Sequence, residues 1–405
     1  MAVGISALPT LYPVKGIRLG TCEAGLRYPD RRDLVVIETS PGTQAAAVFT
    51  RNRFCAAPVI IAQQHVGKTP PRALMINTGY ANAGMGDVGL QDALSCCEAL
   101  AKHVGCSREE VLPFSTGVIG ERLRVDRIIA GLVTCLEQLS ESGWADAAYG
   151  IMTTDTVAKG ASRRVSLGAN AVTVTGIAKG AGMIRPDMAT MLAFIATDAS
   201  LNRETLQQCL NESVAQSFNR ITVDGDTSTN DACVLLASGR SGVVVDGTAG
   251  EMYKRLVNAV SEVCLELAHA VVRDAEGATK FITIDVVGGA SEADCLEVAY
   301  TIAHSSLVKT AFFASDPNWG RLLAAIGRAR ISALDLNAVS IYMDDVCVVR
   351  HGAVDTDYTE AKGQSVMRNP EVTVRIVLGS GSNSARIWTS DLSDEYVRIN
   401  ADYRT

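Results

Sequence analysis

The sequence has few aromatic residues, few histidines and no grouped cysteines. Aromatic side chains make up 5% of the 405 residues, and the five histidines are dispersed without an HExxH or similar group. The eleven cysteines run from Cys22 to Cys347, only Cys96 and Cys97 are adjacent, and no CxxC pair occurs. A disulfide framework or a zinc site needs clustered or regular spacing. We therefore expect reduced thiols in a core and no metal.

The chain also lacks a strongly basic segment and a long apolar one. Its formal net charge is −7, and no Lys/Arg face is concentrated anywhere along it. Neither nucleic acid nor an anionic membrane is therefore expected as a partner. The first residues lack the basic start and apolar run of a signal peptide, and no stretch is long and apolar enough to span a bilayer. We expect a soluble, cytoplasmic protein.

Signatures of nucleotide binding and of common hydrolases are missing. No GxxxxGK[ST] or GxSxG motif occurs, and Lys179–Met183 lacks the third glycine of a dinucleotide loop. Nothing in the sequence indicates a Ser/His/Asp triad. We therefore expect no cofactor, and any catalytic group must come from the side chains and backbone of the chain itself.

Hydrophobic residues are plentiful, at 47%, and there are 35 glycines. This mixture is typical of a compact α/β protein with many tight turns. Short apolar runs predict strands, among them Leu34–Ile37, Val59–Ile61, Leu74–Ile76, Arg164–Leu167 and Ala171–Ile177. Helical spacing predicts helices, among them Gln91–Val104, Arg124–Leu139, Arg203–Ser217 and Gly250–Val272. Strands and helices do not alternate one for one, which favours mixed sheets covered by helices over a Rossmann or barrel fold.

One segment, Lys179–Ile195, is unusual because two glycines and a proline precede a buried-looking strand. Thr190 opens that strand after the small residue Ala189. A strained turn would let the Thr190 hydroxyl attack the Ala189 carbonyl, and water would open the resulting ester. The new chain would begin at Thr190.

A threonine hydroxyl is a weak nucleophile without an adjacent base. A chain that begins at Thr190 carries such a base in its own α-amine, whose pKa of about 7.7–8.0 lies close to the working pH. The alternative interpretation is that Thr190 simply opens a β-strand.

Acyl transfer also needs donors for a tetrahedral oxyanion. The run Leu112–Glu121 ends its apolar part in Ser-Thr-Gly, where Gly117 allows close backbone approach and Thr116 adds a hydroxyl. An ordinary strand-to-helix turn is the alternative.

Groups for a zwitterionic or acidic substrate occur in two further segments. Met152–Thr156 contains Thr153, Thr154 and Asp155, and Lys179 suits a substrate α-carboxylate. Glu276 lies beside a glycine and suits a substrate amine. Taken singly, a residue of any of these types is more often a solvated charge or a turn former.

In this order, the segments resemble one family nearly from end to end. It is the family of self-processing ornithine acetyltransferases of the cyclic arginine pathway, also called bifunctional glutamate N-acetyltransferases. The matching segments are Ala47–Asn52, Ser115–Glu121, Met152–Thr156, Lys179–Ala196, Ser217–Asp231, Glu276–Lys280, Ser315–Arg321 and Tyr396–Thr405. Two local departures, Asn77–Ala83 and Ala275, concern loop shape rather than the chemical groups.

The resemblance implies cleavage between Ala189 and Thr190, giving an α chain of residues 1–189 and a β chain of residues 190–405. It implies a mixed α/β sandwich that shares the logic of N-terminal-nucleophile hydrolases but has a distinct fold. Two α and two β chains would form a heterotetramer, with each pair intertwined in one catalytic unit. Its nucleophile falls on Thr190, its oxyanion pair on Thr116 and Gly117, and its substrate contacts on Thr153, Lys179, Thr190, Glu276, Asn400 and Thr405.

The activity implied is acetyl transfer from N2-acetyl-L-ornithine to L-glutamate through an acetyl-Thr190 intermediate. The polar tail that carries Asn400 and Thr405 should then fold over the site instead of being disordered, which is the default for a terminus. Acetyl-CoA is expected as a second donor. The alternatives are a monofunctional ornithine acetyltransferase, a self-processing amidohydrolase or aminopeptidase, and a binding protein without catalysis.

Overall fold

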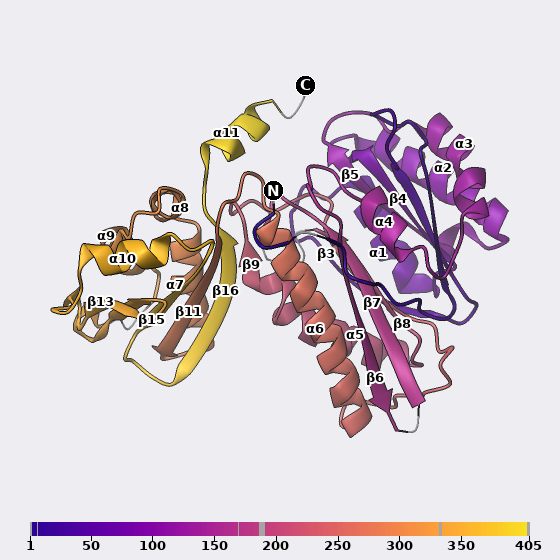
Figure 1. The fold of residues 1–405 in the computed structure, drawn as a ribbon. Coiled ribbons are helices and arrows are strands. Elements are labelled where there is room, and N and C mark those ends of the chain that lie inside the picture. Colours follow the sequence, from indigo (N-terminus) through magenta and orange to yellow (C-terminus); the bar gives the residue numbers. More distant parts are fainter. Residues whose placement is uncertain (1, 6, 169, 186–190, 332–333, 403–405) are drawn as a thin grey trace. The chain divides into compact units, whose positions relative to one another are not determined.

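The computed structural model of the chain describes residues 2–5, 7–168, 170–185, 191–331 and 334–402. The chain forms two compact units (Figure 1). The large unit contains Ala7–Asn219 and Asp226–Val271, and the small unit contains Met1–Ser6, Arg220–Gly225 and Val272–Thr405. The large unit includes segments from both sides of position 190. The predicted division into residues 1–189 and 190–405 concerns a cut in the chain rather than compact units, and it stays a prediction.

The large unit is built on two mixed β-sheets. The four-stranded sheet has the order β1 (Ile17–Cys22), β2 (Leu34–Thr39), β4 (Ala73–Tyr80) and β5 (Val111–Val118). The five-stranded sheet has the order β3 (Gln44–Phe49), β10 (Ala232–Ala237), β8 (Leu192–Thr197), β7 (Asn170–Lys179) and β6 (Lys159–Leu167). The pairs β4–β5 and β8–β10 are parallel, and the other pairs are antiparallel.

The two sheets pack face to face on an apolar core. Alternate residues of a strand face the same side, so Ile76 and Phe114 of one sheet meet Phe194 and Val234 of the other in one buried cluster. The rings of Phe114 and Phe194 pack edge to face with centroids 5.1 Å apart. This contact joins the middle of β5 to the middle of β8 across the core.

Helices cover the outer faces of both sheets. On the four-stranded sheet, α2 (Gly86–Val104) and α3 (Val125–Glu137) pack through a second apolar cluster. On the five-stranded sheet, Gly176 of β7 lies against Val263 and Leu267 of α6 (Glu251–Arg273), and a Cβ there would come within 3.1 Å of both. The helix α5 (Arg203–Ala215) packs on β3 and β10. By contrast, α4 (Trp144–Gly150) contacts strands of both sheets and adds Trp144 to the core between them.

The predicted strand at Val59–Ile61 is wrong. These residues lie inside α1 (Ala57–Lys68), which has Pro58 in its first turn. A three-residue apolar run has no distinguishable period, whereas proline at the start of a helix is favoured because its missing N–H has no intrahelical partner there.

The small unit is a seven-stranded mixed sheet covered by helices. Its strand order is β14 (Ala353–Val354), β13 (Val346–Arg350), β12 (Ser340–Met343), β15 (Glu371–Val377), β11 (Phe281–Gly289), β16 (Asn383–Ser390) and β9 (Ile221–Thr222). Its helices are α7 (Glu292–Ala303), α8 (Ser306–Phe313), α9 (Trp319–Gly327), α10 (Glu360–Met367) and α11 (Asp394–Ala401). The helices α7 to α10 share one apolar cluster with the sheet.

The predicted mixed sheets between helix layers are thus confirmed. The strands predicted at Arg164–Leu167 and Ala171–Ile177 are also present within β6 and β7, and Leu167 of β6 pairs with Asn170 of β7. All eleven cysteines lie in the described ranges and are free thiols.

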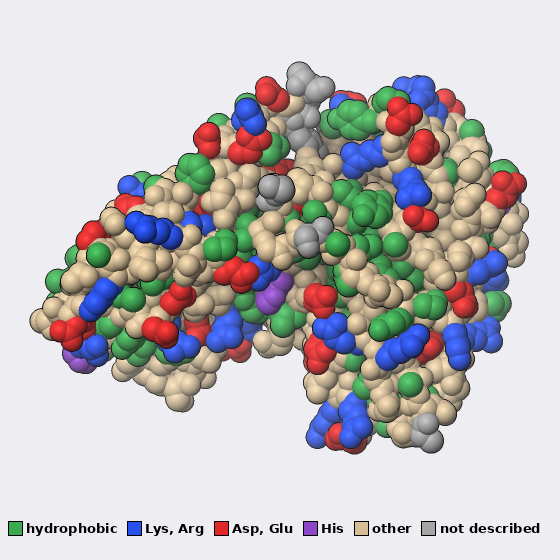
Figure 2. All heavy atoms as spheres, viewed as in Figure 1, with side chains coloured by type: hydrophobic (Ala, Val, Ile, Leu, Met, Phe, Trp, Pro, Cys, Tyr) green, Lys and Arg blue, Asp and Glu red, His purple; other side chains and the backbone are tan. Residues whose placement is uncertain are grey.

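In the part of the chain that the structure describes, no helix combines the length and the hydropathy needed to cross a membrane. On the face drawn in Figure 2, basic side chains are interspersed with acidic ones.

Candidate active site

The predicted oxyanion pair lies at the end of β5, in register with Thr78 and Gly79 of β4. Gly117 has φ +132°, and a Cβ on it would come within 2.3 Å of the Gly79 carbonyl carbon. Only glycine fits this position, because the backbone of β4 occupies the space that a side chain would need. The segment is therefore a strand end with an irregular pairing and not a simple turn.

Lys179, the last residue of β7, connects two other predicted site residues. Its Nζ donates to Thr116 Oγ1 at 2.9 Å and to Thr153 Oγ1 at 3.1 Å. An ammonium group has only donors, so both hydroxyl oxygens act as acceptors in these contacts. The hydroxyl hydrogen of Thr116 is thereby directed away from Lys179.

Asp155 organises the loop that presents Thr153. Its Oδ1 accepts from Lys159 Nζ at 2.5 Å and from the Gly180 N–H at 2.8 Å, and its Oδ2 accepts from the Thr153 N–H at 2.9 Å. Burial alone would raise the pKa of Asp155, but the charges of Lys159 and Lys179 outweigh it and hold the pKa below its ordinary value. The buried carboxylate thus fixes the backbone of both Thr153 and Gly180.

A second brace comes from the segment before β10. Asn230 Nδ2 donates to the carbonyl oxygens of Ala81, at 2.6 Å, and Ser115, at 2.9 Å. Thr229 Oγ1 in turn donates to Asn230 Oδ1 at 2.6 Å. This buried amide therefore ties the loop after β4 to the residue that precedes Thr116.

The predicted cleavage position, Ala189 and Thr190, lies outside the described residues. Met191 follows it, and its carbonyl accepts from the Ala232 N–H at 2.9 Å at the start of β10. Gly180 has φ +151°, and a Cβ there would come within 3.2 Å of Met191 Cβ. The residues just after position 190 therefore adjoin both Gly180 and the start of β10.

Two predicted substrate contacts lie together in the small unit. Asn400 Nδ2, on α11, donates to Glu276 Oε2 at 2.8 Å. Glu276 is buried at 9% exposure, whereas Asn400 is exposed. The tail is helical as far as α11, its placement over the site stays a prediction, and Thr405 lies outside the described residues.

The start of α11 is fastened to the loop that carries Glu276. Ser393 Oγ, the N-cap of α11, accepts from the Tyr396 N–H and donates to the Gly277 carbonyl at 2.7 Å. Asp391 accepts from the Thr279 N–H at 2.8 Å and from the Lys280 N–H at 3.0 Å. These bonds hold the Glu276 loop and the terminal helix as one assembly.

The structure thus brings Thr116, Gly117, Thr153 and Lys179 together in the large unit, and Glu276 and Asn400 in the small one. Sequence reasoning missed Lys159, Asn230 and Asp391 as supporting groups. The i, i+4 spacing of Asp155 and Lys159 is the sequence feature that could have indicated their ion pair. That spacing indicates a pair only on a helix, and these two residues lie outside any helix. Among the described residues, no three His, Cys, Asp or Glu side chains are grouped so that they could hold a metal ion.

Comparison with known proteins gives consistent matches over the chain. A sequence model of the ArgJ family matches residues 18–405. The chain is 52% identical over 406 residues to the arginine biosynthesis bifunctional protein ArgJ of Pseudomonas fluorescens, covering all of both chains. It is 56% identical over 395 residues to that of Methylococcus capsulatus, covering 98% of this chain and 97% of the relative.

A solved structure agrees with these matches. The crystal structure of arginine biosynthesis bifunctional protein ArgJ from Bacillus halodurans has 35% identity and a TM-score of 0.50, and the alignment covers 52% of this chain and 99% of that chain. The fold and these relatives place the chain among the acyltransferases of arginine biosynthesis. It belongs to the ArgJ family, and the resemblance read from the sequence is confirmed.

Proposed function

We propose that the chain transfers an acetyl group from N2-acetyl-L-ornithine to L-glutamate after cutting itself between Ala189 and Thr190. Thr190 attacks the acetyl carbonyl, and its own α-amine takes the hydroxyl proton and passes it to the departing ornithine nitrogen. Glutamate then attacks the threonine ester, giving N-acetylglutamate and regenerating Thr190. Acetyl-CoA serves as a second donor to the same threonine.

The contact of Lys179 with Thr116 carries this proposal. Because the ammonium can only donate, the Thr116 hydroxyl accepts from it and keeps its own hydrogen for another acceptor. An ammonium donor also polarises that hydroxyl and strengthens it as a donor. A carbonyl oxygen that becomes negative beside Thr116 and the backbone of Gly117 is the acceptor that this arrangement suits.

The substrate contacts follow from the same residues. Lys179 and Thr153 suit an α-carboxylate, while Glu276, with Asn400 and Thr405, suits a substrate amine. The length of the B. halodurans chain supports the cleavage step. It is matched almost entirely by slightly more than half of this chain, as expected for a mature β chain. We further propose that two α and two β chains form a cytoplasmic heterotetramer.

Replacement of Thr190 tests the proposal. Thr190→Ala should give one uncut band on a denaturing gel and no release of ornithine from N2-acetylornithine. Thr134→Ala is the matched control, because Thr134 is an exposed residue of α3, and this variant should cut and react normally. A Thr190→Ala protein that is cleaved and active would overturn the proposal.

Activity assays with different substrates identify the acetyl donor and the acetyl acceptor. Glutamate should accelerate ornithine release and appear as N-acetylglutamate, whereas acetate release at the same rate without glutamate would indicate a hydrolase. Acetyl-CoA with glutamate alone distinguishes a bifunctional enzyme from a monofunctional one. Native mass spectrometry of the cleaved protein tests the heterotetramer.

A further inference from the structure

Two cysteines of the large unit lie in contact, although they are 113 residues apart in the sequence. The Sγ of Cys135, on α3, donates to the Sγ of Cys22, the last residue of β1, at 2.9 Å. Cys22 Sγ in turn donates to the Gly131 carbonyl at 3.2 Å, and Cys135 Sγ lies 3.4 Å from the Leu34 carbonyl oxygen. Because a disulfide bond is about 2.0 Å long, the two sulfurs need to approach by about 1 Å to form one.

One member of this thiol pair borders a cavity. Cys22 is 6% exposed and lines a cavity of about 550 Å³ together with residues of α3 and of the segment before α4. Thr134, Gln138 and Ser142 of that lining are exposed, so the cavity is open to water. Cys135, by contrast, is fully buried. A small oxidant in the cavity therefore meets Cys22 first, with Cys135 behind it.

Cys22 also differs from the other thiols in its acidity. The hydrogen bond from Cys135 lowers the pKa of Cys22, although burial and the charges of Asp33 and Glu23 oppose the shift. All eleven thiols lie in the described ranges, and the other ten have raised pKa values. Burial is the main cause for nine of these, whereas the pKa of Cys135 is raised mainly by its hydrogen bond with Cys22. Because the thiolate is the reactive form, Cys22 is the thiol of this chain best suited to attack an oxidant.

We propose that Cys22 and Cys135 form a redox-sensitive pair that a hydroperoxide closes into a disulfide between β1 and α3. The Cys22 thiolate attacks the O–O bond, an S–O bond forms, and the departing oxygen takes up a proton and leaves as water or an alcohol. The Cys135 sulfur then attacks the resulting sulfenic acid, and an S–S bond replaces the S–O bond. The hydroxyl group leaves with the Cys135 proton as water. The two thiols thus lose two electrons, the hydroperoxide gains them, and a reducing thiol reverses the change.

The thiol pair lies in the same row of the four-stranded sheet as a residue of the candidate active site. Cys22 pairs with Leu34, Leu34 with Asn77, and Asn77 with Ser115, which precedes Thr116. A disulfide from Cys22 to α3 therefore fastens the end of the sheet that presents Thr116. A cross-link that closes a loop of this length stabilises the folded state. Oxidation of the pair requires neither acetyl transfer nor cleavage at position 190.

Hydrogen peroxide tests the pair in the whole purified protein. The reduced protein is treated with peroxide, its remaining thiols are alkylated, and its non-reduced digest is mapped by mass spectrometry. We expect one main cross-link, between Cys22 and Cys135, which dithiothreitol removes. The melting temperature of the cross-linked protein should be higher than that of the reduced protein by about 5–10 °C.

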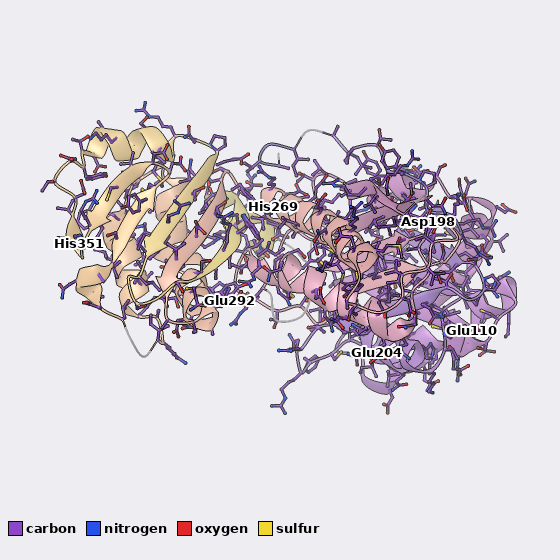
Figure 3. The ribbon with its side chains drawn as sticks, turned by 90° about the horizontal axis from the view of Figure 1, so that it is seen from below. Glu110, Asp198, Glu204, His269, Glu292 and His351 are labelled. Atoms are coloured by element: carbon purple, nitrogen blue, oxygen red, sulfur yellow. The ribbon has the colours of Figure 1, made fainter. Side chains whose placement is uncertain are left out.

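Two variants separate the roles of the two thiols. In Cys135→Ala, oxidation should be slower, because the hydrogen bond to Cys22 is lost, and it should stop at a sulfenic acid on Cys22 that dimedone traps. In Cys22→Ala, the buried Cys135 should stay unmodified. Cys106→Ala is the matched control, since Cys106 is less buried than either thiol, but burial and the charge of Glu110 (Figure 3) raise its pKa. This variant should form the cross-link as the wild type does.

Absence of the Cys22–Cys135 cross-link from the oxidised wild type overturns the proposal, as does a mixture in which other thiol pairs are linked equally often. A cross-link that forms without raising the melting temperature overturns it too, because such a link would not join folded elements. Sulfenic acid on Cys135 in Cys22→Ala would mean that Cys22 is not the thiol that meets the oxidant. If a variant does not fold, the cross-link map and the melting temperature of the wild type decide, since they need no substitution.

Discussion

The predicted site residues of the two units are held in different ways. In the large unit, Thr116, Gly117 and Lys179 lie at strand ends and are fixed by backbone packing and by buried charges. In the small unit, Glu276 meets Asn400 on an exposed terminal helix through one hydrogen bond. Groups that must be aligned for bond making need the first kind of support, and groups that select a substrate can use the second. Substitutions should therefore lower kcat in the large unit and raise KM in the small one.

The strongest test of this contrast is Gly117→Ala. A methyl group 2.3 Å from the Gly79 carbonyl carbon must displace the end of β5. Loss of one oxyanion donor lowers kcat by about 10²–10³, so kcat should fall by at least this factor. Gly120→Ala is the control, because Gly120 also has positive φ but has no atom within 4 Å of the added carbon. Equal losses in both variants, measured by steady-state kinetics, would contradict a specific role for Gly117.

Lys159→Met should affect stability more than any other charge removal in the large unit. Lys159 and Asp155 form a buried pair with side chains 1% and 0% exposed. Removing one partner of such a pair destabilises a protein by about 3–5 kcal/mol. Lys102→Met is the control, since its pair with Glu98 is exposed and should contribute little to stability. Urea denaturation of both variants measures the difference.

In the small unit, Asn400→Ala should raise KM about tenfold and leave kcat and the melting temperature nearly unchanged. It removes the 2.8 Å bond to Glu276 from a residue at the solvent-exposed end of α11. Val397→Ala, on the same helix and 62% exposed, should leave KM unchanged. A fall in kcat with unchanged KM for Asn400→Ala would break the contrast between the units.

The smallest effect concerns a buried cation in the small unit. Lys309 Nζ donates to Thr389 Oγ1 at 3.1 Å and to the Ser390 carbonyl, and burial lowers its pKa to about 8, although Asp391 and Asp224 oppose the shift. Between pH 8 and 10.5 the unfolded chain binds more protons at Lys309 than the folded one, so stability should rise with pH there.

Lys309→Met should lack that rise. From pH 8 to pH 10.5, the free energy of unfolding of the wild type should rise by on the order of 2 kcal/mol relative to that of Lys309→Met. Denaturation at several pH values from 7.5 to 10.5 provides the measurement. A difference that does not change with pH would mean that Lys309 is not desolvated.

In the large unit, the sequence predicts the site residues better than it predicts the residues that hold them in place. Thr116, Gly117, Thr153 and Lys179 are marked by local motifs, and the structure joins three of them through Lys179. Asn230 acts through contacts with residues that are distant in sequence. Lys159 acts on Asp155 in an irregular loop. A local sequence pattern predicts neither kind of contact.

The same limit applies to the fold. Long helices such as α2 and α6 were predicted because their periods repeat several times, and strands such as β2 and β4 were predicted from short, continuous apolar runs. The Val59–Ile61 run was too short to show a period, so tertiary packing of α1 decided its structure. The helix α11 is eight residues long and has no buried residue, so its position depends on Ser393 and the Glu276 loop rather than on an apolar stripe.

The order of the five-stranded sheet has a consequence for the two chains that the proposed cleavage would give. The strands β8 and β10, which follow position 190, lie next to each other, with β7 on one side and β3 on the other, both from before it. Each product therefore supplies strands that complete the other's hydrogen-bonded ladder and core. Separation of the two chains would break the hydrogen bonds between β10 and β3 and between β7 and β8, and it would expose the apolar core between the sheets. The cut is thus expected to create a new chain end while the two chains stay associated.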